Sequence, residues 1–233
     1  MQQLLQGKWA LVTGSSRGVG RHIARGLADR GCNVIIHGRQ LSHTQETQKQ
    51  LAEHNVETCC IAGGLDSEEG IQDILEAVAT GPGRVDILYN NAAVMSKAAP
   101  ICEIPQAEWL RILQVNLFAM IRLCNAFTPA MAARGYGRVI NLTSGIADQP
   151  ELAPYSVSKA AVDKYSRDLA FAYKGRNVLV NTLDPGWLKT DMGGPNAWGE
   201  VESVLPGALV PALLEDNGPS GRFYAAQDFK YLA

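Results

Sequence analysis

A tyrosine and a lysine, four residues apart in the stretch PYSVSK (154–159), are the first side chains whose pairing suggests chemistry. Pro154 suits the first turn of a helix. Because four residues advance a helix by about 400°, Tyr155 and Lys159 are expected to project from nearly the same face. A phenol has a pKa of about 10, and a nearby ammonium favours the phenolate and lowers that pKa. The pair therefore suits a general acid or base, although a half-buried tyrosine beside a solvated lysine would give the same spacing.

Two polar residues on neighbouring elements favour the catalytic interpretation of this pair. Ser144 ends an apolar strand pattern in INLTSG, and Asn116 lies in QVNLFAM, inside a long helical pattern. An isolated tyrosine and lysine at this spacing would more often be structural. With a serine and an asparagine supplied by other elements, Tyr155 and Lys159 are predicted to be catalytic.

A glycine-rich segment near the N-terminus, TGSSRGVG (13–20), lies between a strand pattern and a helix pattern. Gly14, Gly18 and Gly20 allow a tight turn and a close approach of a ligand to the backbone. The N-terminus of the following helix offers free N–H groups and a partial positive charge to a pyrophosphate. Glycines also occur in ordinary loops, but this strand–turn–helix context favours nucleotide binding.

The residues at the end of the second predicted strand indicate whether NAD(H) or NADP(H) is the preferred dinucleotide. NAD-selective sites commonly place a carboxylate there, on the ribose 2′-hydroxyl, but the sequence HGRQ (37–40) contains no acid. Arg39 is in this stretch, and Arg17 lies inside the glycine turn. Each arginine alone could be ordinary surface charge. Together they suit a 2′-phosphate better than a hydroxyl, so NADP(H) is predicted in preference to NAD(H).

The elements that position these residues alternate between apolar strands and amphipathic helices. Strands are predicted at 8–13, 33–37, 56–62, 84–89, 138–143, 177–183 and 221–226, and helices at 21–31, 42–54, 67–80, 106–133 and 154–173. Near-continuous apolar strands separated by helices indicate a parallel sheet covered on both faces. The predicted fold is α/β, a single-domain doubly wound parallel sheet (Rossmann fold) of about seven strands, spanning residues 1–233.

Composition excludes several other classes of protein. A net charge of −2 gives no large positive field for nucleic acid or an anionic membrane surface. No apolar run reaches the roughly 18 residues of a membrane span, and the N-terminus lacks the features of a signal peptide, so a cytoplasmic protein is expected. The five cysteines form no C-x-x-C pair and are expected to be reduced and mostly buried. The four histidines show no metal-ligand spacing, and no metal site is predicted.

Taken in order, the motifs resemble those of the short-chain dehydrogenase/reductase family. They are the T-G-x-x-x-G-x-G turn, NNAA (90–93), Asn116, Ser144, the Y-x-x-x-K pair and DPGWLKTDM (184–192), and they cover about residues 7 to 194. The resemblance implies an NAD(P)-dependent oxidoreductase that interconverts a ketone or aldehyde and an alcohol by hydride transfer. It also implies a homodimer or homotetramer, formed through the helices at 106–133 and 154–173.

The same resemblance assigns roles to individual residues. Ser144 would hydrogen-bond the substrate carbonyl, and Tyr155 would donate a proton in reduction or remove it in oxidation. Lys159 would hold the nicotinamide ribose and tune Tyr155, while Asn116 would anchor a water in a proton relay. The residues expected to contact the cofactor are Gly14, Ser16, Arg17, Gly18, Val19, Gly20, Arg39, Leu65, Asn90, Ala92, Tyr155, Lys159, Pro185, Gly186, Leu188 and Thr190.

The chain departs from the family pattern at three places. Gly64 stands where an aspartate near the adenine is usual, and Asp66 follows two residues later. Ala93 replaces a glycine and adds a methyl group close to the cofactor. The interval from Ser144 to Tyr155 is one or two residues shorter than usual, which could widen the substrate pocket. None of these changes removes a catalytic group.

The segment 192–205 corresponds to a mobile substrate lid in the family. Trp187, Met192 and Trp198 could line an apolar pocket or pack in the core, and no basic cluster is present for a carboxylate or a carrier. A small, fairly apolar ketone or aldehyde is therefore predicted. Two other functions stay open: a 3-oxoacyl acyl-carrier-protein or coenzyme A reductase with the same catalytic residues, and a non-catalytic dinucleotide sensor or scaffold. Sensors usually lack the tyrosine or the lysine.

Overall fold

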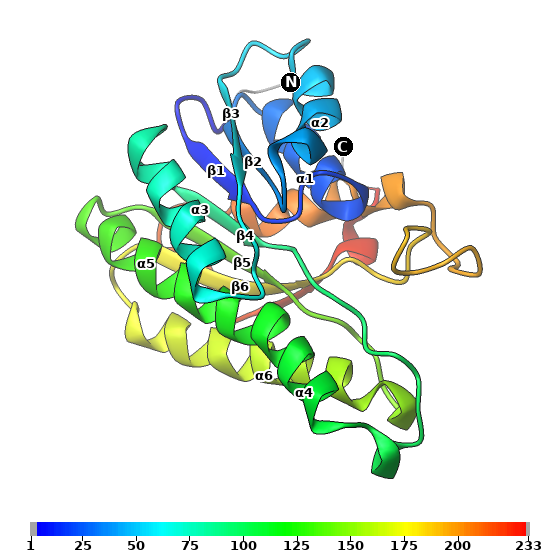
Figure 1. Ribbon diagram of the computed structural model, residues 1–233. Coiled ribbons are helices and arrows are strands. Elements are labelled where there is room, and N and C mark those ends of the chain that lie inside the picture. The colour runs from blue at the N-terminus through cyan, green and yellow to red at the C-terminus, as the bar shows by residue number, and fades with distance from the viewer. Residues whose placement is uncertain (1–3, 232–233) are drawn as a thin grey trace.

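One parallel sheet forms the centre of the computed structural model, which describes residues 4–231 (Figure 1). Residues 1–3 and 232–233 of the predicted domain lie outside the described residues. The strands are β1 (Trp9–Val12), β2 (Asn33–Gly38), β3 (Thr58–Ala62), β4 (Ile87–Asn90), β5 (Gly137–Leu142), β6 (Val178–Asp184) and β7 (Phe223–Ala225). They are all parallel, in the order β3-β2-β1-β4-β5-β6-β7. The order reverses between β1 and β4, which is the switch point where doubly wound sheets bind ligands.

Helices cover both faces of the sheet. They are α1 (Gly18–Ala28), α2 (Gln45–Leu51), α3 (Glu68–Thr80), α4 (Gln106–Leu113), α5 (Ala119–Ala133) and α6 (Ala153–Ala172). Side chains alternate along each strand, so Val12 and Ile36 pack with α1 while Leu11 and Ile35 pack in the core that includes α3, α5 and α6. Figure 1 shows these two layers on either side of the strands. The predicted fold class is confirmed.

Three predicted helices differ from those in the structure. The helix predicted at 21–31 is α1, which begins three residues earlier, at Gly18, and ends at Ala28. The helix predicted at 106–133 is α4 and α5 joined by a π-helical turn, Gln114–Phe118. Asn116 lies in that turn, and such turns are frequent at functional sites. The helix predicted at 42–54 is shorter: it begins with a 3₁₀ turn (Leu41–Thr44) and its α-helical part ends at Leu51.

The stretch 106–133 is also apolar. With a mean hydropathy of 1.2 and 28 residues, it is long and apolar enough to cross a membrane by those two measures. However, Leu123, Cys124 and Met131 are buried in the core beneath the sheet. Packing within the domain accounts for part of this apolar composition, since 33% of the most apolar window is buried.

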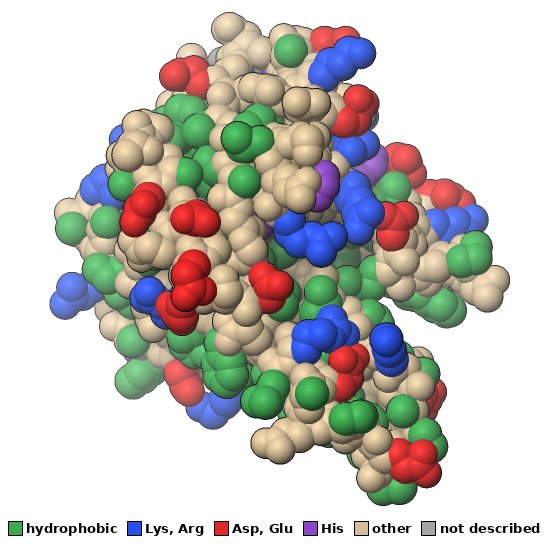
Figure 2. Space-filling model, in the orientation of Figure 1, with side chains coloured by type: hydrophobic (Ala, Val, Ile, Leu, Met, Phe, Trp, Pro, Cys, Tyr) green, Lys and Arg blue, Asp and Glu red, His purple; other side chains and the backbone are tan. Residues whose placement is uncertain are grey.

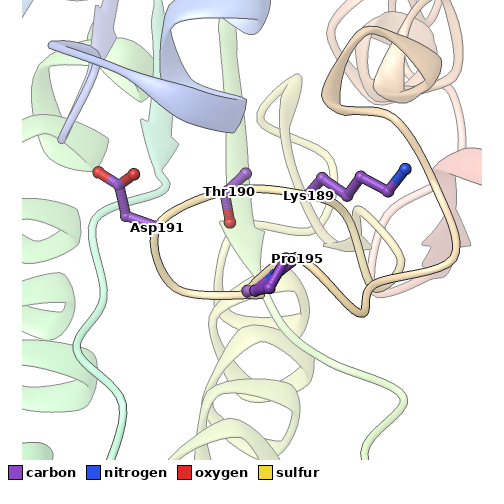
Figure 3. A pocket seen from close by; sticks show the side chains of 5 residues that line it. Lys189, Thr190, Asp191 and Pro195 are labelled. Carbon is purple, nitrogen blue, oxygen red and sulfur yellow. The ribbon is translucent and has the colours of Figure 1, made fainter.

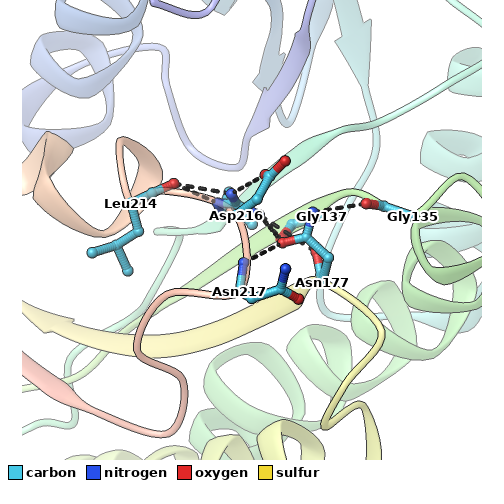
Figure 4. A network of polar contacts seen from close by, with 7 residues as sticks. Gly135, Gly137, Asn177, Leu214, Asp216 and Asn217 are labelled. Atoms are coloured by element: carbon cyan, nitrogen blue, oxygen red, sulfur yellow. Dashed lines mark hydrogen bonds and ion pairs between the residues drawn. The ribbon is translucent and has the colours of Figure 1, made fainter.

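A network of polar contacts lies at the amino-terminal end of the sheet (Figure 4). Arg138, the second residue of β5, is only 1% exposed and donates hydrogen bonds to the Leu214 carbonyl (2.9 Å) and the Asp216 carboxylate (3.0 Å). Asn177, just before β6, accepts from the Asn217 backbone N–H (2.9 Å). These bonds attach the C-terminal segment to β5 and β6, at the end of the sheet opposite the candidate site.

Candidate active site

The predicted catalytic residues come together beyond the carboxyl end of β5. Ser144 lies two residues after this strand, and Tyr155 and Lys159 lie on α6. The Lys159 ammonium donates to the carbonyl of Leu142, the last residue of β5 (2.8 Å), and lies 5.7 Å from the centre of the Tyr155 ring. The Ser144 hydroxyl accepts from the Ile146 N–H (3.2 Å) and lies close enough to the Tyr155 phenol to lower its pKa. The phenol and the ammonium are therefore buried side by side, and the Ser144 hydroxyl, which is partly exposed, completes the group.

Burial dominates the acid–base properties of this group. It raises the pKa of Tyr155; the hydrogen bond with Ser144 acts in the opposite direction, and the Asp184 carboxylate adds to the rise. Burial also lowers the pKa of Lys159 to about 8, against the carboxylates of Asp163 and Asp184. The sequence predicted that Lys159 would lower the pKa of Tyr155. That direction is wrong for the structure as it stands, because desolvation of the phenol outweighs the other effects.

Asn116 is 3% exposed and holds two segments together. Its carbonyl oxygen accepts from the Val94 N–H (2.8 Å), and its amide donates to the Val94 carbonyl (3.0 Å) and the Ser158 hydroxyl (3.1 Å). The Ser158 hydroxyl in turn donates to the Tyr155 carbonyl (2.6 Å). The side chain thus fixes the segment after β4 against the turn of α6 that carries the tyrosine.

The glycine turn has the backbone geometry that a phosphate site requires. Gly14 (φ +64°) and Gly18 (φ +55°) adopt the left-handed conformation that favours glycine. A Cβ on Gly20 would lie 2.5 Å from the Asn91 amide nitrogen and 2.6 Å from the Gly14 carbonyl, so no larger residue fits there. The Thr13 hydroxyl accepts from the Asn91 and Ala92 N–H groups (both 3.0 Å) and joins this turn to the segment after β4.

The residues around this turn fit a dinucleotide. The first turn of α1 contains no acidic side chain and its N-cap, Arg17, makes no side-chain cap, so its N–H groups are available to an anion. Asn90 ends β4; its amide donates to Asn141 (2.8 Å), while its buried carbonyl oxygen has no partner within residues 4–231. A buried acceptor without a partner is costly and suits a ligand hydroxyl.

The two arginines predicted to bind a 2′-phosphate lie in different surroundings. Arg39 follows β2 and is exposed. Arg17 forms an ion pair with Asp191 (2.8 Å) in which both side chains are about 70% exposed (69% and 71%). The Arg17 guanidinium therefore contacts the segment after β6, and this partner was not predicted.

The segment after β6 folds over the glycine turn as a loop. A Cβ on Gly18 would lie 3.5 Å from the Thr190 side chain. The Thr190 hydroxyl points into the loop and accepts from the Gly193 N–H (3.0 Å), and Trp187 donates to the Gly193 carbonyl (2.8 Å). The loop surrounds an open pocket of about 380 Å³ that is lined by Lys189, Thr190, Asp191, Gly194 and Pro195. Figure 3 shows the loop and the side chains of this pocket.

The apolar residues of this loop are largely on the surface. Trp187, Met192 and Trp198 are 52%, 41% and 61% exposed, which excludes plain core packing for them. Figure 2 shows the surface hollowed between this loop and the lobe that carries α4. Such exposed apolar side chains beside a hollow suit contact with an apolar ligand.

The other predicted cofactor residues are placed by the same elements. Leu65 follows β3 and is 8% exposed, Leu188 is 3% exposed, and Val19 lies in the first turn of α1. The Ser16 carbonyl accepts from Arg21, the Pro185 carbonyl accepts from Gln227 (3.0 Å), and Gly186 has φ +87°. The remaining site residues, Gly14, Gly18, Gly20, Asn90, Ala92 and Thr190, are described above.

Sequence reasoning missed a carboxylate that shapes the site. Asp184, the last residue of β6, accepts from the Gly145 N–H (3.0 Å) with one oxygen and from the Gly186 N–H (2.9 Å) with the other. It thereby ties the loop of Ser144 to the turn after β6. The aspartate directly before a Pro–Gly pair was a usable signal, because aspartate side chains often bond the backbone two residues on.

Other sequence expectations concerned cysteines and metals. All five cysteines are free; Cys32 and Cys124 are buried, Cys59 and Cys60 are partly exposed, and Cys102 is exposed. Among residues 4–231, no group of histidine, cysteine and acidic side chains is arranged to hold a metal ion.

Fold and site together define an α/β oxidoreductase that binds a dinucleotide. Comparison with known proteins agrees: the family model for short chain dehydrogenases matches residues 8–199. The 3-oxoacyl acyl-carrier-protein reductase FabG of Vibrio cholerae is 35% identical over 210 residues, covering 89% of this chain and 84% of the relative. The gluconate 5-dehydrogenase of Gluconobacter oxydans is 30% identical over 224 residues, covering 88% and 87%.

A solved structure shows the same fold. A putative NAD(P)-dependent gluconate 5-dehydrogenase from Beutenbergia cavernae, determined with bound NADP, superimposes with a TM-score of 0.86 at 28% identity, and all of both chains is covered. The chain therefore belongs to the short-chain dehydrogenase family, whose oxidoreductases act on CH–OH and C=O groups.

Proposed function

We propose that this chain is an NADP(H)-dependent carbonyl reductase or alcohol dehydrogenase in which Tyr155 is the general acid and base. One observation carries the proposal: Ser144, Tyr155 and Lys159 come together at the carboxyl end of β5, with Tyr155 and Lys159 buried, at the same edge of the sheet as the glycine turn. Members of the family that serve as sensors usually lose the tyrosine or the lysine, and both are present here.

The chemistry follows from the atoms of this group. A bound nicotinamide would supply the hydride. In the reducing direction, Ser144 donates a hydrogen bond to the substrate oxygen as negative charge develops there, and the Tyr155 O–H bond breaks as its proton moves to that oxygen. The resulting phenolate is stabilised by the hydrogen bond with Ser144 and by the nearby Lys159 charge. In oxidation the same proton moves in the opposite direction.

Lys159 is suited to a second task. Its pKa of about 8 leaves it mostly protonated at neutral pH, and an ammonium has three donors. The Leu142 carbonyl takes one of them, so the others can hold the nicotinamide ribose. Asn116, packed against the same turn of α6, would anchor the water that returns a proton to Tyr155.

The substrate is proposed to be a small, fairly apolar ketone or aldehyde. The exposed Trp187, Met192 and Trp198 support this, and the segment 192–205 would act as the lid. The one lysine in the loop next to the pocket, Lys189, is paired with Glu200 and gives no free charge for an acidic substrate. The likeness to FabG supports a second candidate, a 3-oxoacyl acyl-carrier-protein or coenzyme A reductase.

A substrate panel tests the reaction and separates the candidates. Purified protein with NADPH is mixed with simple apolar ketones and aldehydes, with acetoacetyl thioesters, and with a keto sugar acid, and the loss of absorbance of the reduced nicotinamide is followed. Turnover highest with the simple carbonyls supports the proposal, and turnover highest with the thioesters supports the second candidate. Binding of NADPH without turnover of any carbonyl, in either direction, would identify a sensor instead.

The preference for NADP(H) is proposed from Arg39, supported by the absence of an acid at the end of β2. Hydrogen bonds to charged groups contribute about 1.5–3 kcal/mol each, and solvent screening reduces that at an exposed site. We expect kcat/KM to favour NADPH over NADH by roughly tens to hundreds of fold, or about 2–3 kcal/mol. Arg39→Asp should reverse the preference, because the carboxylate repels the phosphate and accepts from the ribose hydroxyls.

The matched control for this charge reversal is Arg176→Asp. Arg176 is also exposed, but it lies before β6 at the opposite end of the sheet. It should leave the ratio of the two kcat/KM values unchanged. A parent protein that uses both cofactors equally, or prefers NADH, would contradict the NADP(H) proposal but would leave the oxidoreductase assignment intact.

The assembly is proposed to be a homodimer or homotetramer of this single dinucleotide-binding domain. Exposed apolar side chains on or beside α4, α5 and α6 support this: Leu110, Phe118, Val157 and Phe171 are 46–79% exposed. A cytoplasmic location, without nucleic acid or membrane as a partner, is proposed from the near-neutral charge balance. Sedimentation of the purified protein tests the assembly.

A further inference from the structure

His37, near the end of β2, is 2% exposed and uses both nitrogens of its ring. Its Nδ1 accepts a hydrogen bond from the Gly14 N–H (3.0 Å), and its Nε2 lies 3.0 Å from the Gly63 carbonyl. Because a backbone N–H can only donate and a carbonyl can only accept, the ring must be neutral, with its proton on Nε2. The imidazole therefore connects the glycine turn after β1 to the turn after β3.

The backbone of His37 holds the next residue of the glycine turn. Its N–H donates to the Ser15 hydroxyl (3.0 Å), and its carbonyl accepts from the Ser15 N–H (3.1 Å). On the other side, the Thr47 hydroxyl donates to the Ser15 carbonyl (2.9 Å). Gly14 and Ser15, the second and third residues of the glycine-rich segment, are thus attached to β2 by both the side chain and the backbone of one residue.

Burial keeps this arrangement intact at ordinary pH, since it lowers the pKa of His37 to about 4 against the opposing effect of the Gly63 carbonyl. The turn that His37 holds is the one where Gly14 has a positive φ and Gly20 contacts the Gly14 carbonyl so closely that no Cβ fits. A small displacement at Gly14 would therefore move the N-terminus of α1, whose N–H groups would face the phosphates of a bound dinucleotide.

We propose that His37 is a positioning residue for the dinucleotide: as a neutral Nε2–H tautomer, it holds the phosphate-binding turn in its ligand-ready shape by bonding Gly14 to Gly63. The inference rests on the proposed function, because it assumes that the glycine turn binds a dinucleotide. It assigns His37 a role separate from that of Arg39, two residues later. The phosphate-binding backbone is common to NADP(H) and NAD(H), so His37 supports both cofactors equally.

Two substitutions separate the two bonds of the ring. In His37→Asn the side-chain oxygen takes the place of Nδ1 and can accept from Gly14. In His37→Gln the amide nitrogen takes the place of Nε2 and can donate to Gly63, but Gly14 loses its acceptor. The control is His54→Gln, because His54 also bonds a neighbouring group, Asp29 (2.9 Å), away from the turn.

The measurement is the equilibrium Kd for NADPH and for NADH, by fluorescence titration of each purified variant, together with its melting temperature and kcat. For His37→Gln we expect both Kd values to rise by the same factor, about tenfold, with kcat within about twofold of the parent. For His37→Asn we expect Kd within about threefold of the parent, and for His54→Gln no change. An unchanged Kd in folded His37→Gln, or a loss confined to one cofactor, would overturn the proposal.

A milder variant keeps the proposal testable if His37→Gln does not fold. Ser15→Ala removes the side-chain acceptor for the His37 N–H and should raise both Kd values by the same factor, about threefold; unchanged Kd values would overturn the proposal. Titration of the parent protein with each nucleotide tests the proposed function separately from the role of His37. A parent that binds neither nucleotide refutes the proposed function and the role of His37 with it, whereas a parent that binds as well as His37→Gln does refutes only the role of His37.

Discussion

Two buried cations lie at opposite ends of β5, and the number of hydrogen bonds that each makes within the protein differs. At the amino end, Arg138 is 1% exposed, donates to the Leu214 and Gly137 carbonyls and to Asp216, and stacks at 4.3 Å on the ring of Tyr136. At the carboxyl end, Lys159 is 3% exposed and donates to the Leu142 carbonyl.

The difference follows from the chemistry of the two groups. A guanidinium keeps its charge at any ordinary pH and presents its donors in a fixed plane, which suits a permanent structural network. An ammonium loses its proton more readily when buried, and the pKa of Lys159 is lowered to about 8. Lys159 is therefore held in place at some cost to stability and keeps donors for a ligand, whereas Arg138 uses its donors within the fold.

The largest effect is expected beside the lysine, at Tyr155. Tyr155→Phe removes the transferable proton and should reduce kcat by about 10²–10⁴-fold, while the Kd for NADPH stays close to that of the parent. Tyr165→Phe is the control, since Tyr165 lies on the same helix and its hydroxyl donates to Asn125 (3.1 Å) outside the site. Retention of half the parent activity in Tyr155→Phe would rule out the acid–base assignment.

At the amino end of β5 the expected effect is on stability alone. Arg138→Met removes the donors to Leu214 and Gly137, and bonds to charged groups contribute about 1.5–3 kcal/mol each. The free energy of unfolding should fall by ~2–4 kcal/mol, as measured by urea denaturation. The kcat of the folded fraction should not change. A loss of turnover in folded Arg138→Met would mean that the two ends of β5 are coupled.

Lys159→Met should show the opposite result, with lower activity and no loss of stability. We expect kcat/KM to fall at least about tenfold, which is roughly one pKa unit of altered Tyr155 acidity, together with weaker cofactor binding. The basic limb of the pH–rate profile should move upward, because the cation that favours the phenolate is gone. Urea denaturation should give a free energy of unfolding equal to or above that of the parent.

The pH dependence of stability gives a further check on Lys159. Its folded pKa (about 8) lies below its ordinary value of 10.5, so between these values the unfolded chain binds more protons than the folded chain. The stability of the parent should therefore rise with pH across this window, relative to that of Lys159→Met. An unchanged pH–rate profile and an unchanged pH dependence of stability would show that Lys159 is an ordinary structural residue.

The sequence predicted the fold because periodicity and apolar runs are local properties. The switch from short apolar strands to amphipathic helices placed all seven strands within three residues of their observed bounds. The candidate catalytic residues could be predicted as readily, because Tyr155 and Lys159 share a helix and Ser144 closely follows a strand. The pKa values of these residues could not be predicted from the sequence. The pKa of Tyr155 rises because tertiary packing removes its phenol from water.

Features that depend on register or on irregular backbone were missed. His37 contacts Gly14 and Gly63 only because β2 lies between β1 and β3 in the sheet, and nothing in the spacing HGRQ indicates those bonds. The π-helical turn at Gln114–Phe118 interrupts a continuous helical pattern without a proline or glycine to mark it. The partner of Arg17 lies on the loop after β6, far away in the sequence.

The smallest effect is expected from substitution of Asp191, the partner of Arg17. Arg17 is a cation on the surface, in contrast to the buried Lys159 and Arg138. Arg17 and Asp191 are exposed, and a pair of this kind contributes about 0–1 kcal/mol, so Asp191→Asn should leave the melting temperature almost unchanged. If Arg17 binds the 2′-phosphate, Asp191 competes with that phosphate. The substitution should then lower the KM for NADPH by about two- to fivefold, which corresponds to at most about 1 kcal/mol, and leave the KM for NADH unchanged.

The control for Asp191→Asn is Glu200→Gln, which breaks the other ion pair of the same loop, between Lys189 and Glu200, without releasing Arg17. It should not change the KM for either cofactor. Because exposed charges are screened by salt, the gain in Asp191→Asn should shrink as ionic strength rises. A KM for NADPH that is unchanged at low salt, or an equal gain in Glu200→Gln, would show that Arg17 serves only to hold the loop and that the selectivity for NADP(H) depends on Arg39 alone.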